Sequence, residues 1–168
     1  ANETAAAWRV ALVRREDPTG IVLTRHSVPI LDQTRSVESG GLARGAYVLK
    51  DAADGEPDLI LIATGSEVHL ALEAQEILAE RGLQARVVSM PCWRRFEAQP
   101  TAYRNDVLPP EVRARLAIEA AAPLGWERYV GREGAVMGIE RFGASAPYRD
   151  LVKVFDFTPE AVAERAVM

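Results

Sequence analysis

Three consecutive residues, Thr64, Gly65 and Ser66, offer the hydroxyls and backbone N–H groups that anion-binding turns use. They follow the continuous apolar run Leu59–Ala63, which is typical of a strand buried on both faces of a parallel sheet. Ligands bind at the carboxyl ends of such strands, and helix N-termini attract anions. The segment matches neither the dinucleotide nor the P-loop glycine pattern. An ordinary strand-to-helix turn, with Thr64 and Glu67 in a capping box, is therefore the other interpretation.

A planar guanidinium, that of Arg25, lies at the end of a second short apolar run, residues 21–24, and beside His26. An arginine at a strand terminus is suited to hold a phosphate with two parallel hydrogen bonds. Exposed arginines are common, so an ordinary surface ion pair explains the same residue. The residues alone leave both interpretations open.

Other reactive side chains are few. The single cysteine, Cys92, has arginines beside it, as reactive cysteines often do, but no histidine is close in sequence. We expect it to be a packed structural residue. The two histidines, His26 and His69, are too few for a histidine-based metal cluster, and the chain has no G-x-S-x-G nucleophile pattern. The patterns therefore predict no metal site.

Alternating strands and helices must position these residues. This alternation predicts a three-layer α/β/α domain around a mostly parallel sheet, preceded by a short N-terminal helix–strand remnant. Gly82 is expected to end the second helix, and Thr158 to cap the last. Helices are predicted over 2–14, 67–81, 126–130, 147–155 and 159–168, and strands over 21–24, 46–49, 59–63, 85–90, 114–119 and 135–139.

A long polar stretch, residues 27–44, separates the first helix and strand from the rest. Loops of this length are uncommon inside compact domains, so the stretch is interpreted as a linker. The sequence thus predicts a small N-terminal unit, a linker over residues 27–44 and a second unit that starts near residue 45.

Composition excludes several classes of function. The chain has 168 residues, 48% of them apolar and 26% charged, with a formal net charge of −4. No basic stripe favours nucleic acid, and no apolar run approaches the ~20 residues of a membrane span. The chain starts without a signal-peptide pattern and without Met, so we expect a processed or excised piece. One cysteine favours a cytoplasmic protein.

Several specific sequence strings occur along the chain. They are 62–68 (IATGSEV), 87–93 (VVSMPCW), 107–110 (VLPP) and 142–147 (FGASAP), together with Gly125-Trp126 and 129–131. This ordered set resembles the C-terminal region of transketolase and covers essentially the whole chain. The resemblance implies that residues 1–35 are the tail of the family's middle, pyrimidine-binding domain with its linker. It implies that residues 45–168 are the transketolase C-terminal domain.

Transketolases use thiamine diphosphate and a divalent metal, Mg²⁺ or Ca²⁺, to move a two-carbon ketol unit from a ketose phosphate to an aldose phosphate. The cofactor carries the carbanion chemistry. The family's diphosphate and metal ligands, catalytic glutamate and pyrimidine contacts lie in earlier regions. The resemblance thus implies no catalytic, cofactor or metal residue here, no cofactor bound to this chain alone, and no activity of its own. It implies three partners: the rest of the chain, a homodimer mate and sugar phosphates.

The resemblance also assigns one substrate contact. The family's phosphate-binding arginine follows the strand near the end of the middle domain, and residues 21–26 match that place, so Arg25 takes this role. The family usually has Ser-Arg-Gln there; Thr24 and His26 depart from it and leave the arginine intact.

Three alternatives to a transketolase remain. One is the last domain of another thiamine enzyme, such as the β subunit of a 2-oxoacid dehydrogenase, against which the string at 87–93 argues. Another is a free-standing regulatory module that binds an anion at Thr64, Gly65 and Ser66. The third is a purely structural dimerisation module.

Overall fold

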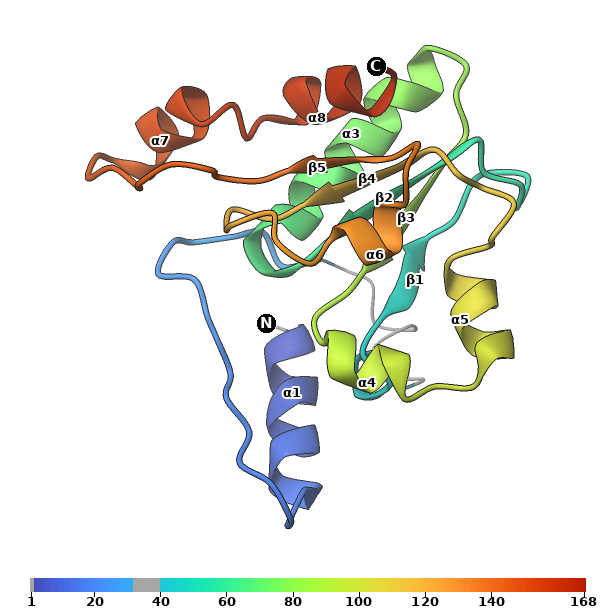
Figure 1. Ribbon diagram of the computed structural model, residues 1–168. Helices are drawn as coiled ribbons and strands as arrows, with labels where there is room; N and C mark the ends of the chain where they lie inside the picture. The colour runs from blue at the N-terminus through green and yellow to red at the C-terminus, as the bar shows by residue number, and fades with distance from the viewer. Residues whose placement is uncertain (1, 32–39) are drawn as a thin grey trace.

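The computed structural model describes residues 2–31 and 40–168. Its centre is a five-stranded sheet of order β1-β3-β2-β4-β5 (Figure 1). The four strands β2 to β5 are mutually parallel, and β1 pairs antiparallel with β3 at one edge. This confirms the predicted mostly parallel sheet. The strands are β1 (Tyr47–Lys50), β2 (Leu59–Ala63), β3 (Ala85–Ser89), β4 (Arg115–Ile118) and β5 (Ala135–Met137).

Helices cover both faces of the sheet and make the predicted three layers (Figure 1). One face carries two helices that pack on each other, α3 (Val68–Glu80) and α8 (Pro159–Ala166). The other carries α4 (Trp93–Glu97), α5 (Thr101–Val107) and α6 (Glu127–Val130). A further helix, α7 (Tyr148–Val154), extends past the end of the sheet.

The central strand β2 explains why its sequence is apolar without alternation. Leu59, Leu61 and Ala63 enter the core under α3 and α8. Ile60 and Ile62 enter the second core, which surrounds the buried Trp126. Burial on both faces requires an apolar side chain at every position.

The predicted ends of two helices are confirmed. Gly82, at φ 79°, follows α3, and the N–H of Leu83 returns to the Leu78 carbonyl at 3.0 Å. This is the left-handed turn that glycine adopts most readily at a helix end. Thr158 Oγ accepts the Ala161 N–H at 3.2 Å and so caps α8.

The N-terminal helix α1 (Asn2–Val13) stands away from the sheet (Figure 1). Its Ala6, Ala7 and Val10 pack against the core, and its first turn makes hydrogen bonds to the domain. The Glu3 carboxylate accepts hydrogen bonds from the Tyr47 and Ser89 hydroxyls, the former at 2.7 Å. Tyr47 and Ser89 lie opposite each other on β1 and β3. One carboxylate therefore joins α1 to the edge of the sheet.

The predicted strand at 21–24 is wrong, so the helix–strand remnant is only a helix followed by an extended segment. Residues 18–24 have extended or irregular backbone that pairs with no strand in the described part of the chain. Val22 is 99% exposed and Leu23 is 58% exposed. An apolar run becomes a strand only beside another strand that satisfies its backbone groups.

The linker prediction over 27–44 falls partly on residues 32–39, which lie outside the described residues. The described ends are an extended segment up to Leu31 and a short 3-10 helix, η1 (Leu42–Arg44). Within 2–31 and 40–168, no helix has both the length and the apolar character that crossing a membrane requires.

Candidate functional site

The carboxyl ends of β2 and β4 form the place where a parallel sheet of this order binds ligands. The chain moves from β2 to β3 on one side and places β4 on the other, so this gap is a topological switch point. Thr64, Gly65 and Ser66 lie at this gap. They continue into a 3-10 turn, η2 (Gly65–Glu67), before α3 begins at Val68.

Glu67 fills the gap with its own carboxyl group. The side chain is only 7% exposed. One oxygen accepts the Ser66 hydroxyl at 2.7 Å, and the other accepts the Ala120 N–H, just after β4, at 3.1 Å. Burial, as the largest cause, raises the pKa of Glu67. The carboxyl group thus joins β2 to β4 where a ligand would otherwise lie.

The contacts of Glu67 also correct the predicted capping box. Thr64 makes no side-chain cap to the turn, and the Glu67 carboxyl bonds to Ser66 and Ala120 rather than back to Thr64. An acidic group in the gap repels anions. The geometry therefore gives the anion-binding interpretation of Thr64, Gly65 and Ser66 no support.

Arg25 lies at an exposed bend of the extended segment that follows α1. The bend is shaped by a short-range bond, in which the His26 N–H donates to Thr24 Oγ at 3.2 Å. Among residues 2–31 and 40–168, Arg25 has no ion-pair or hydrogen-bond partner. The alternative of a surface ion pair thus finds no partner in the described structure, and the guanidinium is available for a ligand.

Next to Arg25, the His26 ring stacks on the ring of Tyr148, the first residue of α7. The ring centroids are 4.5 Å apart and the planes are inclined by 29°. Sequence analysis missed this contact because no local pattern links two residues so far apart in the chain. It places the residue next to Arg25 against the start of α7.

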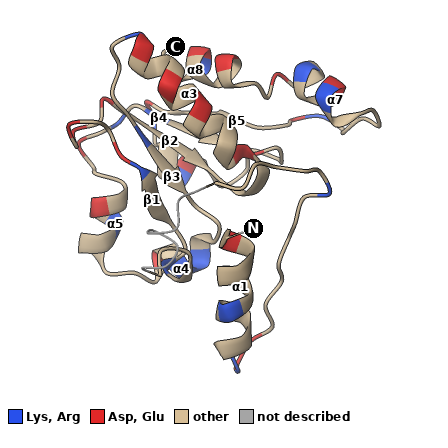
Figure 2. Cartoon of the chain, turned by 180° about the vertical axis from the view of Figure 1, so that it is seen from behind, with Lys and Arg blue, Asp and Glu red and all other residues tan. Residues whose placement is uncertain are grey.

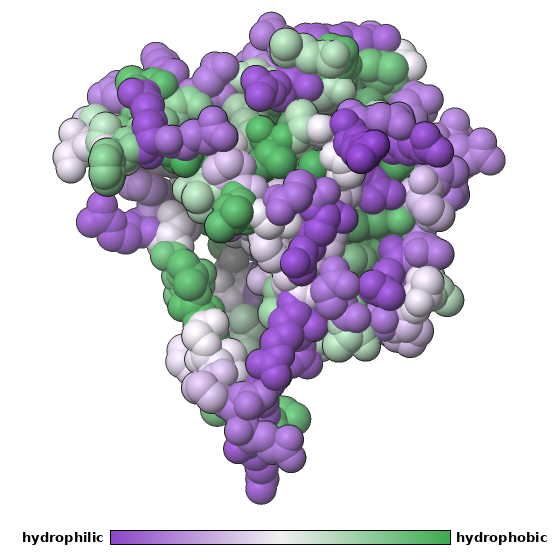
Figure 3. All heavy atoms as spheres, in the orientation of Figure 1, coloured by the Kyte–Doolittle hydropathy of each residue, from purple (hydrophilic) through white to green (hydrophobic). Residues whose placement is uncertain are grey.

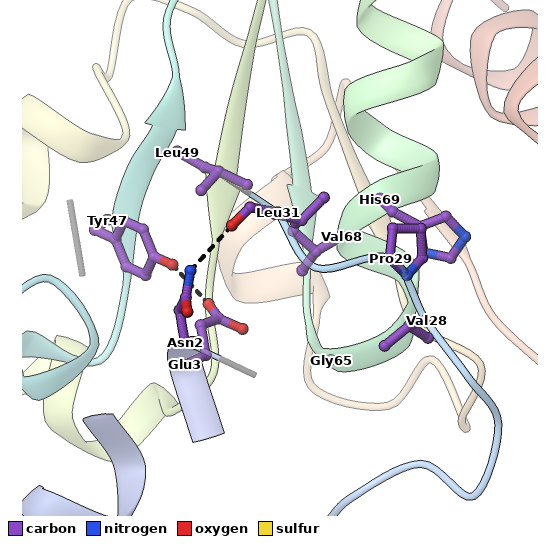
Figure 4. A pocket seen from close by; sticks show the side chains of 10 residues that line it. All are labelled: Asn2, Glu3, Val28, Pro29, Leu31, Tyr47, Leu49, Gly65, Val68 and His69. Carbon is purple, nitrogen blue, oxygen red and sulfur yellow. Dashed lines mark hydrogen bonds between the residues drawn. The ribbon is translucent and has the colours of Figure 1, made fainter. Parts of the chain in front are cut away.

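A small cavity lies where α1 and the extended segment meet the sheet (Figure 4). Its polar walls are Glu3, Tyr47 and His69, and Asn2 donates to the Leu31 carbonyl at 3.0 Å beside it. The cavity holds about 70 Å³, which is room for roughly two water molecules. It is too small for a sugar phosphate and lies at the contact of α1 and the extended segment with the domain.

The remaining candidates make no catalytic cluster. Cys92 is half-buried at the start of α4, and its N–H donates to the Gly45 carbonyl at 3.0 Å. His69 lies on the first turn of α3, against the cavity. Residues 2–31 and 40–168 bring no three His, Cys, Asp or Glu side chains together as a metal site.

Comparison with known proteins shows which family this chain belongs to. Residues 45–158 match the family model of the transketolase-like TK C-terminal domain. The chain belongs to the transketolase family. The transketolase of Geobacillus stearothermophilus is 54% identical over 165 residues, which are 98% of this chain and 25% of that protein. That of Mycobacterium tuberculosis is 52% identical over 172 residues, 99% of this chain and 24% of that protein.

Solved transketolases have the same fold. The Pichia stipitis enzyme in complex with sedoheptulose 7-phosphate superposes with a TM-score of 0.88 at 38% identity, over 99% of this chain and 23% of that one. The Leishmania mexicana enzyme gives 0.87 at 40%, over 99% and 24%. The resemblance stated from the sequence strings is confirmed, which decides against a 2-oxoacid dehydrogenase. The chain spans about a quarter of the length of these relatives.

Proposed function

We propose that this chain is the C-terminal part of a thiamine diphosphate-dependent transketolase, with residues 1–35 ending its middle domain and 45–168 forming its last domain. The whole enzyme transfers a two-carbon ketol unit between ketose and aldose phosphates. Membership of the family supports this reaction, and so do the complexes of the Pichia stipitis transketolase with sedoheptulose 7-phosphate and xylulose 5-phosphate. Both of these ligands are ketose phosphates.

Thiamine diphosphate and its metal do not fit the residues present. The described chain has no cluster of metal ligands, and the carboxyl group of Glu67 occupies the gap between the carboxyl ends of β2 and β4. We therefore assign the cofactor and its Mg²⁺ or Ca²⁺ to the rest of the enzyme, and no step of the reaction to groups of this chain. The chain alone is then inactive.

Contacts with the rest of the enzyme form the second part of the proposal. Trp8, Leu12 and Val13 of α1 are exposed apolar side chains that suit packing against another part of a larger protein. We assign the whole enzyme to the cytoplasm as a homodimer. Light scattering of the whole enzyme after size exclusion should give the mass of two chains; a mass of one chain at high concentration would contradict the assignment.

One observation carries a substrate role for this chain: the exposed guanidinium of Arg25 has no partner in the described structure. A guanidinium can donate two parallel hydrogen bonds to a phosphate. In the whole enzyme, Arg25→Ala should raise KM for xylulose 5-phosphate and ribose 5-phosphate by roughly 10- to 150-fold, which corresponds to one charged hydrogen bond. Steady-state kinetics with both substrates measures the change.

The same kinetics with D-ribose, which has no phosphate, provides the control, because Arg25→Ala should leave its KM unchanged. Arg81→Ala is the matched control variant. Arg81 is also an exposed arginine, but it follows the C-terminal end of α3, whereas the candidate site lies at the N-terminal end of that helix. An unchanged KM for the phosphorylated substrates in Arg25→Ala would remove Arg25 from substrate binding.

A further inference from the structure

Beside Arg25 in the sequence, the ring of His26 stacks on Tyr148 of the C-terminal domain. His26 is the next residue along the chain, and both rings are half-buried. A ring pair at 4.5 Å with a small interplanar angle has the offset-stacked geometry that aromatic side chains favour. Tyr148 is therefore placed to hold the bend on which Arg25 lies.

Tyr148 is half-buried and lies near acidic groups of the domain. It begins α7 directly after Pro147, and burial, followed by the nearby charges of Glu67 and Glu73, raises its pKa. These acids lie at the start of α3 and on its outer face, whose charged residues Glu73, Glu76 and Glu80 are all acidic (Figure 2). The phenol thus stays uncharged, and its ring lies against His26 of the extended segment, near the acidic groups Glu67 and Glu73.

The segment that carries Arg25 has few other attachments. Before it, Asp17 pairs with Arg14 and Arg94 at the surface, and residues 18–24 are exposed except for the half-buried Ile21. After it, the chain makes its next firm contact at Leu31, which packs against the core. Removing the stack would leave a long span in which Arg25 is free to move.

We propose that Tyr148 is a positioning residue, which acts through the ring of His26 to hold Arg25 in the orientation that binds substrate phosphate. This inference rests on the proposed function, because it requires Arg25 to be the phosphate ligand. It gives the C-terminal domain a part in selecting phosphorylated substrates. Binding energy depends on such pre-ordering, since an arginine that moves freely must lose that freedom on binding.

The test compares substitutions on both sides of the stack in the whole enzyme. Tyr148→Ala and His26→Ala should each raise KM for ribose 5-phosphate by about 2- to 12-fold, the range of one aromatic pair. KM for D-ribose should not change, and neither should kcat with either substrate. Tyr148→Phe keeps the ring and should behave as the unchanged enzyme. Val154→Ala, an exposed apolar position on the same helix, is the matched control.

Combined variants show whether Tyr148 acts through Arg25. Adding Tyr148→Ala to Arg25→Ala should cause no further rise in KM, because the residue being positioned is already gone. Additive effects, or an unchanged KM in both single variants while Arg25→Ala keeps its large effect, would overturn the inference and leave the proposed function intact. No effect of Arg25→Ala would overturn both.

Discussion

At the residue scale, Glu67 is an acidic group at which the stability of the fold depends on pH. Its pKa is raised in the folded protein, chiefly by burial, so folding favours the protonated form. The free energy of unfolding therefore falls as pH rises from the ordinary glutamate value of about 4.3 through the folded pKa. Above that window the stability is lower by a constant amount.

Glu67→Gln should remove this loss of stability at higher pH. Its amide oxygen can accept the Ala120 N–H and its amide group can donate to Ser66 Oγ, so both hydrogen bonds survive without a buried charge. Thermal unfolding should show a higher Tm than the unchanged protein at neutral pH and nearly the same Tm at acid pH. Glu80→Gln, at an exposed position of the same helix, should show no such difference. A lower Tm at neutral pH would show that the charge stabilises the fold.

At the element scale, Gly45 ends η1 and packs against the start of α4. Its φ is 95°, and a Cβ atom there would collide with the backbone of Phe96 and Cys92. Gly45→Ala should lower the free energy of unfolding by about 2–5 kcal/mol, from left-handed strain together with overpacking. Urea unfolding measures this. Gly20→Ala meets no atom within 4 Å and provides the control, and equal midpoints for both variants would contradict the prediction.

The elements that sequence could predict are those whose pattern reflects burial within the chain itself. β2 is apolar throughout because both its faces are covered, and α3 is long enough to show helical periodicity. The short helices α4 and α5, of five and seven residues, were missed, although α6 and α7, which are no longer, were predicted. The strand at 21–24 was wrong because its apolar residues find no neighbouring strand in the described chain.

The residues of the candidate site were likewise predicted only in part. Arg25 was singled out by its place after an apolar run, but only the family resemblance favoured phosphate binding over a surface ion pair, and its role stays a prediction. Glu67 was expected in a capping box, but its carboxyl group bonds across to Ala120 because β4 lies beside β2. Its true partner and the Tyr148–His26 stack depend on contacts between distant residues, which local spacing does not predict.

At the scale of the whole molecule, exposed apolar side chains follow the N-terminal part of the chain, and others, such as Leu124 and Phe142, lie on the domain. Figure 3 shows hydrophobic surface at the left of the view, along the extended segment. Trp8, Leu12, Val22, Leu23 and Ile30 are all more than half exposed. Exposed apolar patches of this kind mark contact sites. The N-terminal part is thus built to be covered by protein.

This surface leads to a prediction for the chain by itself. With thiamine diphosphate, Mg²⁺, xylulose 5-phosphate and ribose 5-phosphate, the mass-verified 168-residue chain should give no turnover, because its described residues bring no metal-ligand cluster together. It should also bind an apolar dye such as anilinonaphthalene sulfonate more strongly than the whole enzyme does, since Val22 and its apolar neighbours would be covered there. Turnover free of contaminating whole enzyme would place the reacting centre within these residues and contradict its assignment to the rest of the transketolase.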